Sequence, residues 1–174
     1  MGGCFIRVFR KRISYKYKRF PNKPDAWDNN DINNMLDDFI LYMDEAMLFK
    51  AKCQTVANLP GGRFVDTVAP GPFQLKLYVE PRQFYGRIHG IINTFDLEGE
   101  RIDASSIQPT DNTRWLVHDT QSKKPKPPMQ LTRVAWSAGC FVLHPSDLNG
   151  FNDIVDAYKY NAGDLIDGEL IEGG

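Results

Sequence analysis

The chain has 174 residues, of which 42% are hydrophobic and 25% are charged, and its formal net charge is −1. This length fits one compact domain, and the composition is that of an ordinary globular protein with a hydrophobic core. No apolar stretch is long enough to span a bilayer, so the sequence predicts no transmembrane helix. Collagen-like and low-complexity proteins are excluded as well, because 14 glycines and 11 prolines are ordinary numbers for this length.

The charge is unevenly distributed along the chain. The first 24 residues contain eight basic side chains and no acidic one, whereas the remainder contains 13 basic and 22 acidic residues. We therefore expect a basic N-terminal arm over residues 1–24 and a single domain over residues 25–174. Such an arm can contact an anionic surface, or it can dock on its own domain through the hydrophobic residues between its charges. Arg7 and Arg10 interrupt those hydrophobic residues, which leaves no recognisable signal peptide.

The next segment has the spacing of an amphipathic helix. Between residues 32 and 47, hydrophobic residues recur at intervals of three and four, which predicts a helix. The residues of this stripe are Ile32, Met35, Leu36, Phe39, Ile40, Met43 and Met47.

The middle of the chain, from Thr55 to Leu143, consists of short β-rich runs broken by Gly and Pro. The alternation predicts strands at residues 73–79, 87–92 and 115–118. A closing helix is expected to open at residues 145–148, with Ser146 or Asp147 as its cap. The acidic tail over residues 161–174 is expected to be partly frayed. The expected fold class is therefore α+β and mostly β.

The cysteines and the known nucleotide motifs limit the possible chemistry. Cys4, Cys53 and Cys140 are widely spaced and form no C-x-x-C pair, which argues against a disulfide framework or a zinc ribbon. The chain has neither a P-loop nor a G-x-G-x-x-G sequence, so nothing supports nucleotide binding. We expect no cofactor, no metal and no nucleic-acid partner.

One combination of residues can support nucleophilic catalysis. Cys140 follows Ser137 and Gly139, small residues that let backbone N–H groups approach a substrate carbonyl. His118 ends a predicted strand, from which an imidazole can reach a thiol on a neighbouring strand and lower its pKa. On residue type alone, Cys140 can equally be a buried apolar residue, and His118, beside Asp119, a structural histidine.

The sequence context of the other two histidines predicts structural roles for them. His89 lies in an apolar strand, a setting that favours a hydrogen-bonded structural role. His144, between Leu143 and Pro145, is expected at a corner between a strand and a helix. With His118, they form no recognisable metal-ligand set.

His118 and the run Ser137-Ala138-Gly139-Cys140, separated by 18 residues, resemble the signature of the L,D-transpeptidase (YkuD-like) catalytic domain. Leu59-Pro60-Gly61-Gly62-Arg63-Phe64 and Pro70-Gly71-Pro72-Phe73 are similar to that family's Pro-Gly-x-Phe segment. The resemblance covers roughly residues 56–143. Two positions depart from the family: Ala138 stands where it has a second histidine, and Val142 where it has Arg or Asn.

The resemblance implies a β-sandwich with peripheral helices and a cysteine that is acylated by peptidoglycan stem peptides. Cys140 would be the nucleophile and His118 its general base. Ser137 and Gly139 would position the cysteine, and the N–H groups of Gly139 and Cys140 would hold the oxyanion. Water or an amine would resolve the thioacyl intermediate, in the periplasm or cell envelope.

Residues around this signature are candidates for substrate binding. Trp115, Trp136 and Phe141 flank it, and they can line a groove or pack in the core. Arg133 or Arg114 would have to replace the polar contact that the family's Arg makes. Two other readings stay open: a non-catalytic envelope-binding module, and another Cys–His hydrolase of amide bonds.

Overall fold

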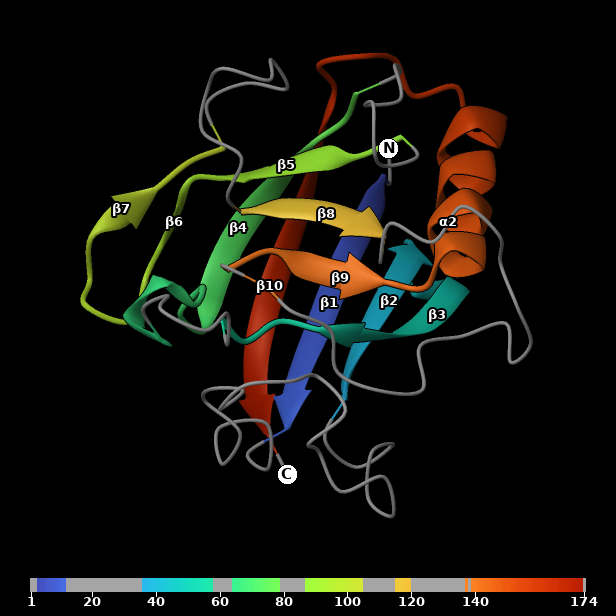
Figure 1. The fold of residues 1–174 in the computed structure, drawn as a ribbon. Helices are drawn as coiled ribbons and strands as arrows, with labels where there is room; N and C mark the ends of the chain where they lie inside the picture. The colour runs from blue at the N-terminus through green and yellow to red at the C-terminus, as the bar shows by residue number, and fades with distance from the viewer. Residues whose placement is uncertain are drawn as a thin grey trace.

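A computed structural model gives the fold and describes residues 3–11, 36–57, 64–78, 87–104, 115–119, 137 and 139–173. Within these ranges the chain is mostly β, with a single α-helix (Figure 1). This confirms the predicted mostly-β composition. The strands are β1 (Cys4–Lys11), β2 (Asp37–Met43), β3 (Ala46–Gln54), β4 (Gly71–Lys76), β5 (His89–Ile92), β6 (Thr94–Phe95), β7 (Arg101–Ile102), β8 (Leu116–Asp119), β9 (Phe141–Leu143) and β10 (Leu165–Gly173). A short 3-10 helix, η4 (Phe64–Asp66), precedes β4, and the helix α2 (Pro145–Ala157) follows β9.

Eight of the described strands pair into a closed barrel in the order β1-β10-β4-β5-β8-β9-β3-β2. Two of these pairings are parallel, β1 with β10 and β8 with β9, and the others are antiparallel. The short strands β6 and β7 form a separate two-stranded sheet. The family resemblance implied a sandwich, whereas here each edge strand finds a partner and the sheet closes on itself.

The main core fills the inside of this barrel. Alternate residues of each strand point inward, and β1 contributes Ile6 and Val8, both fully buried. Phe73 and Phe141 meet edge to face in this core, with ring centroids 5.9 Å apart. Phe141 is therefore a core residue and not part of a substrate groove.

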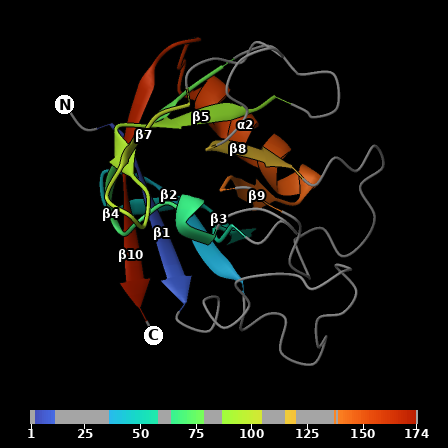
Figure 2. The ribbon, with the colours of Figure 1, turned by 60° about the vertical axis from the view of Figure 1, so that its left-hand side comes forward.

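Helix α2 packs beside the barrel, next to β3 and β8 (Figure 2). Its buried face carries Leu148, Phe151 and Val155, as the sequence predicted. The ring of Phe151 lies 5.5 Å from that of Phe39 on β2, centroid to centroid. This contact ties the helix to β2.

The start of the expected basic arm is part of the barrel. Residues 4–11 form β1, between β2 and β10, while residues 12–24 lie outside the described part. Arg10 is fully buried, and its guanidinium donates to Thr55 Oγ1 at 2.7 Å and to the Val68 carbonyl at 2.5 Å. Arg10 thus serves the fold and is not available to an external anionic surface.

The predicted helix over residues 32–47 is wrong where the structure describes it. Residues 37–43 and 46–54 form the antiparallel pair β2 and β3, and residues 32–35 lie outside the described ranges. Asp44 adopts a left-handed backbone conformation, with φ of 53°, which makes a tight turn between the strands. Residues on both faces of β2 are buried: Phe39 and Leu41 point inward, and Ile40 points outward. The hydrophobic pattern of this segment therefore does not alternate clearly, as that of a typical strand would.

The expectation of a frayed tail is also wrong. Residues 165–173 form β10, which pairs with β1 on one side and β4 on the other. Ile166 and Leu170 are both 1% exposed, because they point into the barrel. The predicted strands at 73–79, 87–92 and 115–118 are confirmed as β4, β5 and β8, with shifts of up to three residues at their ends.

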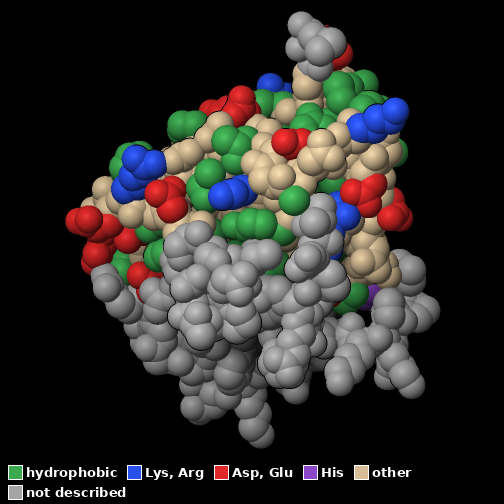
Figure 3. All heavy atoms as spheres, turned by 90° about the horizontal axis from the view of Figure 1, so that it is seen from above, with side chains coloured by type: hydrophobic (Ala, Val, Ile, Leu, Met, Phe, Trp, Pro, Cys, Tyr) green, Lys and Arg blue, Asp and Glu red, His purple; other side chains and the backbone are tan. Residues whose placement is uncertain are grey.

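Figure 3 shows the molecule from above, and the described part of this face carries both positive and negative side chains. Acidic and basic side chains are interspersed there, with hydrophobic groups between them. No helix in the described ranges is long and apolar enough to cross a membrane.

Candidate active site

The thiol of Cys140 and the imidazole of His118 come from the neighbouring parallel strands β8 and β9. Their register pairs Val117 with Phe141 and His118 with Val142, and Cys140 comes directly before β9. Val117 and Phe141 point into the main core. Because side chains alternate along a strand, His118 and Cys140 share the opposite face. There Cys140 packs in a second, smaller cluster with Ile88, Ala104, Leu116 and Val142.

The two groups are buried and bonded to each other. Burial by itself raises the pKa of the Cys140 thiol, but the charge of His118, the hydrogen bond from it and the backbone N–H groups of Leu116 and Trp115 lower that pKa below its ordinary value. Burial likewise opposes protonation of His118, but Cys140 and the Asp119 carbonyl raise the imidazole pKa. Both shifts favour a thiolate–imidazolium pair, the reactive form of a cysteine nucleophile.

The carbonyl of Asp119 orients this histidine. His118 Nδ1 lies 2.5 Å from the Asp119 carbonyl oxygen, which can only accept a hydrogen bond. Nδ1 therefore carries a proton, and Nε2 is directed to the sulfur. Nothing in the sequence indicates this contact, since the acceptor is a backbone group that any residue type supplies.

Ser137 closes the turn that carries the cysteine. Its Oγ donates to the Cys140 carbonyl at 2.9 Å and accepts from the Gly139 N–H at 3.1 Å. The Gly139 N–H is thus committed to Ser137, which corrects its expected role as an oxyanion donor. Of the two expected donors, the Cys140 N–H remains the candidate.

Gly139 occupies a position that no other residue fits. Its φ of 126° lies in a region that L side chains rarely adopt, and a Cβ there would lie 2.8 Å from the Asp66 carbonyl oxygen. The same Cβ would lie 3.0 Å from Nε1 of Trp115. Glycine is therefore required beside the candidate nucleophile.

Trp115 lies beside this turn, at the start of β8. Its indole N–H donates to the Asp66 carbonyl at 2.9 Å, and its backbone has a left-handed φ of 57°. The other two residues expected to bind substrate, Trp136 and Arg133, lie outside the described residues, as do Arg114 and Ala138. Val142, at the position of the family's Arg or Asn, is 1% exposed and apolar, so it supplies no polar contact.

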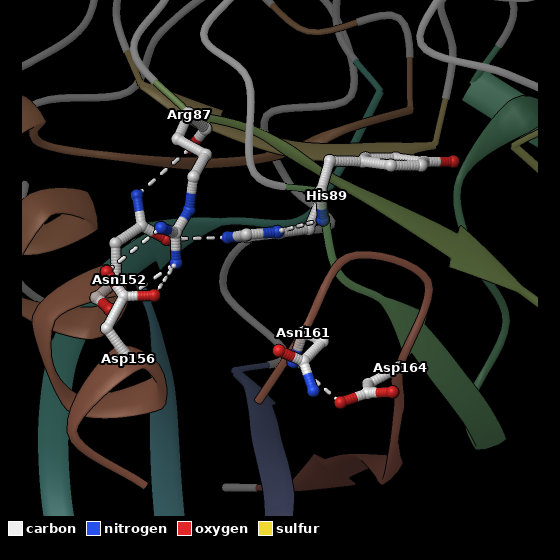
Figure 4. Close-up of polar contacts among 7 residues, drawn as sticks. Arg87, His89, Asn152, Asp156, Asn161 and Asp164 are labelled. Carbon is white, nitrogen blue, oxygen red and sulfur yellow. Dashed lines mark hydrogen bonds and ion pairs between the residues drawn. The ribbon is translucent and has the colours of Figure 1, made fainter. Parts of the chain in front are cut away.

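The structure confirms a structural role for His89 (Figure 4). Its Nδ1 accepts the Tyr78 N–H at 3.1 Å, and its Nε2 donates to Asn152 Oδ1 at 2.6 Å. Asn152 in turn donates to the Arg87 carbonyl, and Arg87 forms an ion pair with Asp156. Burial, opposed by the Asn152 hydrogen bond, lowers the pKa of His89 to about 4. The group links β5 to α2, away from Cys140.

His144 lies at the expected corner between β9 and α2. It is the helix N-cap, and its side chain accepts the Ser146 N–H at 3.1 Å. The predicted caps Ser146 and Asp147 instead lie in the first turn, because Pro145 begins the helix. No group of three potential metal ligands occurs among the residues that the structure describes.

Comparison with known proteins finds a relative of this chain. An uncharacterized protein of Treponema pallidum (strain Nichols) is 39% identical to it over 181 residues, covering 96% of this chain and 79% of the relative. The two proteins belong to one family. No family model matches the chain, and no solved structure does.

Proposed function

We propose that this protein is a cysteine-dependent enzyme that modifies peptidoglycan, an L,D-transpeptidase-like acyltransferase or hydrolase of stem peptides. The observation that carries the proposal is the buried pair of Cys140 and His118, with the imidazole oriented by the Asp119 carbonyl. A thiol held this way by an imidazole and a third group is the arrangement of an activated nucleophile. The resemblance around Cys140 supplies the substrate class.

The reaction uses the pair in two steps. The Cys140 thiolate attacks the carbonyl carbon of the scissile amide, and the carbonyl electron pair moves to the oxygen. As the intermediate collapses, the C–N bond breaks and the leaving amine takes a proton from His118 Nε2, which leaves a thioester. An acceptor amine or a water molecule then attacks this thioester and gives its proton to His118, so that the thiolate is released.

In this family, the closed barrel would take the place of the L,D-transpeptidase β-sandwich. Support comes from the local arrangement: a histidine on one strand and a cysteine immediately before the parallel neighbouring strand. Stem peptides would then be the partner, and the periplasm or cell envelope the place of action. The Ser137 hydroxyl, which holds the cysteine turn from both sides, fits the positioning role that the resemblance assigns to it.

Purified muropeptides test this proposal, with the products identified by mass spectrometry. We expect shortened stems or new cross-links with the native protein and with Cys4→Ala, which removes a thiol remote from His118. Cys140→Ala and His118→Gln should abolish both products. Unchanged muropeptides with folded native protein, or equal products with Cys140→Ala, would overturn the proposal.

Val142 favours a second candidate function. Its buried, apolar side chain leaves the site without the polar contact at this position that L,D-transpeptidases use. A Cys–His hydrolase of ordinary L,L peptide bonds does not need that contact. Cleavage of L,L peptides by the native protein but not by Cys140→Ala, together with intact muropeptides, would identify this alternative. A non-catalytic envelope-binding module would instead leave Cys140 no more reactive than Cys4 or Cys53.

A further inference from the structure

Trp115 contacts the candidate site with both its side chain and its backbone. The indole edge lies against Gly139, next to Cys140, and the indole N–H donates to the Asp66 carbonyl at 2.9 Å. Backbone hydrogen bonding from Trp115 and from the next residue, Leu116, lowers the pKa of the Cys140 thiol. One residue thus joins η4, β8 and the cysteine turn.

The backbone conformation explains how two successive N–H groups reach the same atom. Trp115 has a left-handed φ of 57°, which is unusual for a large side chain. Successive N–H groups around a left-handed residue form a small concavity that favours an anion. A thiolate is such an anion, and Cys140 lies at this concavity.

A strained conformation persists only where its surroundings hold it. At Trp115 two bonds do so: the indole N–H is fixed by the Asp66 carbonyl, and the Trp115 carbonyl accepts the Ile91 N–H at 2.7 Å. Asp66 is itself fixed, because it ends η4, whose Val65 carbonyl accepts the Leu97 N–H at 3.1 Å. The indole therefore connects a rigid segment to the N–H groups at the sulfur.

We propose that Trp115 is a positioning residue for the nucleophile: its indole bond to Asp66 holds the left-handed backbone that directs two N–H groups at the Cys140 thiolate. This inference rests on the proposed function, because it assigns a role within the same site. It gives Trp115 a task other than the substrate contact expected from the sequence.

Trp115→Phe tests the inference, since phenylalanine keeps an aromatic ring but lacks the indole N–H. The measurement is the rate at which iodoacetamide alkylates Cys140 in the folded protein between pH 4 and pH 10, followed by peptide mass spectrometry. We expect the midpoint of the profile to rise by about one pH unit in the variant, with the high-pH rate nearly unchanged. Tyr158→Phe, at an exposed position on the C-terminal side of α2, should leave the profile as it is.

The outcomes separate this inference from the proposed function. In one outcome, the native protein shows a low midpoint of Cys140 alkylation that is the same in Trp115→Phe, even if the variant has reduced thermal stability. This result overturns the positioning role alone. A native midpoint typical of an unperturbed thiol overturns the activated nucleophile, and the positioning role with it. If the variant does not fold, a pH titration of the native protein by NMR decides. The chemical shift of the Leu116 amide proton must then change with a midpoint equal to that of Cys140 alkylation. If it does not, the inference is overturned.

Discussion

Gly139 and the carbonyl oxygen of Asp66 approach so closely that even a methyl group cannot be placed between them. A Cβ on Gly139 would lie 2.8 Å from that oxygen, shorter than any normal contact. The cysteine turn is therefore packed against η4, a segment more than 70 residues earlier in the sequence. The candidate nucleophile depends on this contact for its place.

Gly139→Ala should destabilise the protein and slow alkylation of Cys140. Gly71 provides a matched control: its φ of 137° is similar, but a Cβ added to it would meet nothing within 4 Å. We expect Gly71→Ala to lower the free energy of unfolding by about 1–2 kcal/mol through backbone strain, and Gly139→Ala by at least about 1 kcal/mol more. Urea denaturation measures both. Equal losses in the two variants would show that the contact with Asp66 carries no cost.

The three cysteines should differ in reactivity at neutral pH. Burial raises the pKa of Cys4, and burial together with Asp37 raises that of Cys53 well above its ordinary value, whereas His118 lowers that of Cys140 against its own burial. We expect iodoacetamide to alkylate Cys140 at pH 7 at least about tenfold faster than the other two. His118→Gln should remove this advantage. An unaltered Cys140 rate in that variant would argue against the thiolate–imidazolium pair.

The protein should lose stability in mild acid through His89. The folded protein lowers the pKa of this histidine from 6.5 to about 4, so the unfolded chain takes up a proton first as the pH falls. The contribution of His89 to the free energy of unfolding is therefore fully present above about pH 6.5. As the pH falls from there to about 4, roughly 3 kcal/mol of this contribution is lost.

Urea denaturation at a series of pH values measures this loss, with His89→Gln as the comparison. Glutamine can bond Asn152 but does not titrate, so the free energy of unfolding of the variant should fall less steeply over this range. Burial of Asp147 raises its pKa to about 6 and acts in the opposite direction, because its protonation on acidification favours the fold. This contribution is common to both proteins and cancels in the comparison. Parallel curves would contradict the assignment to His89.

The sequence indicated which side chains form the candidate site, but not how the backbone arranges them. Residue types, together with the resemblance in order and spacing, singled out Cys140 and His118 as candidates, because catalysis of this kind needs a thiol and a base. The groups that hold them, the carbonyls of Asp119 and Asp66, belong to the backbone and leave no mark in a sequence. The left-handed conformation of Trp115 was equally hidden, since tryptophan has no preference for it.

The errors in the fold have a common physical cause. In β2, residues on both faces are buried, so its hydrophobic pattern resembles that of a helix. In the tail, the acidic composition and the two final glycines suggested a solvated end. Asp167 and Glu169 are exposed, however, while Leu165–Gly173 alternates as a strand. A Cβ on Gly168 would lie 2.5 Å from the ring of Phe73, so the glycine makes room for a core side chain. Only the partner strands reveal these roles.

Leu170→Ala distinguishes a structural tail from a frayed one. Leu170 is 1% exposed within the barrel, whereas Leu165, on the same strand, is 45% exposed. We expect Leu170→Ala to lower the free energy of unfolding by about 2–5 kcal/mol, and Leu165→Ala to change it by less than about 0.5 kcal/mol. Thermal or urea denaturation measures both. A negligible effect of Leu170→Ala would mean that β10 does not belong to the folded core.

The parallel pairing of β1 with β10 determines when the protein can fold during its synthesis. Residues 4–11 emerge from the ribosome well before their partner strand over residues 165–173, because more than 150 residues separate the two strands. Until then β1 has one free edge and the interior stays open to water, so a nascent chain exposes the residues that later form the core. The barrel therefore closes only after residues 165–173 have been synthesised.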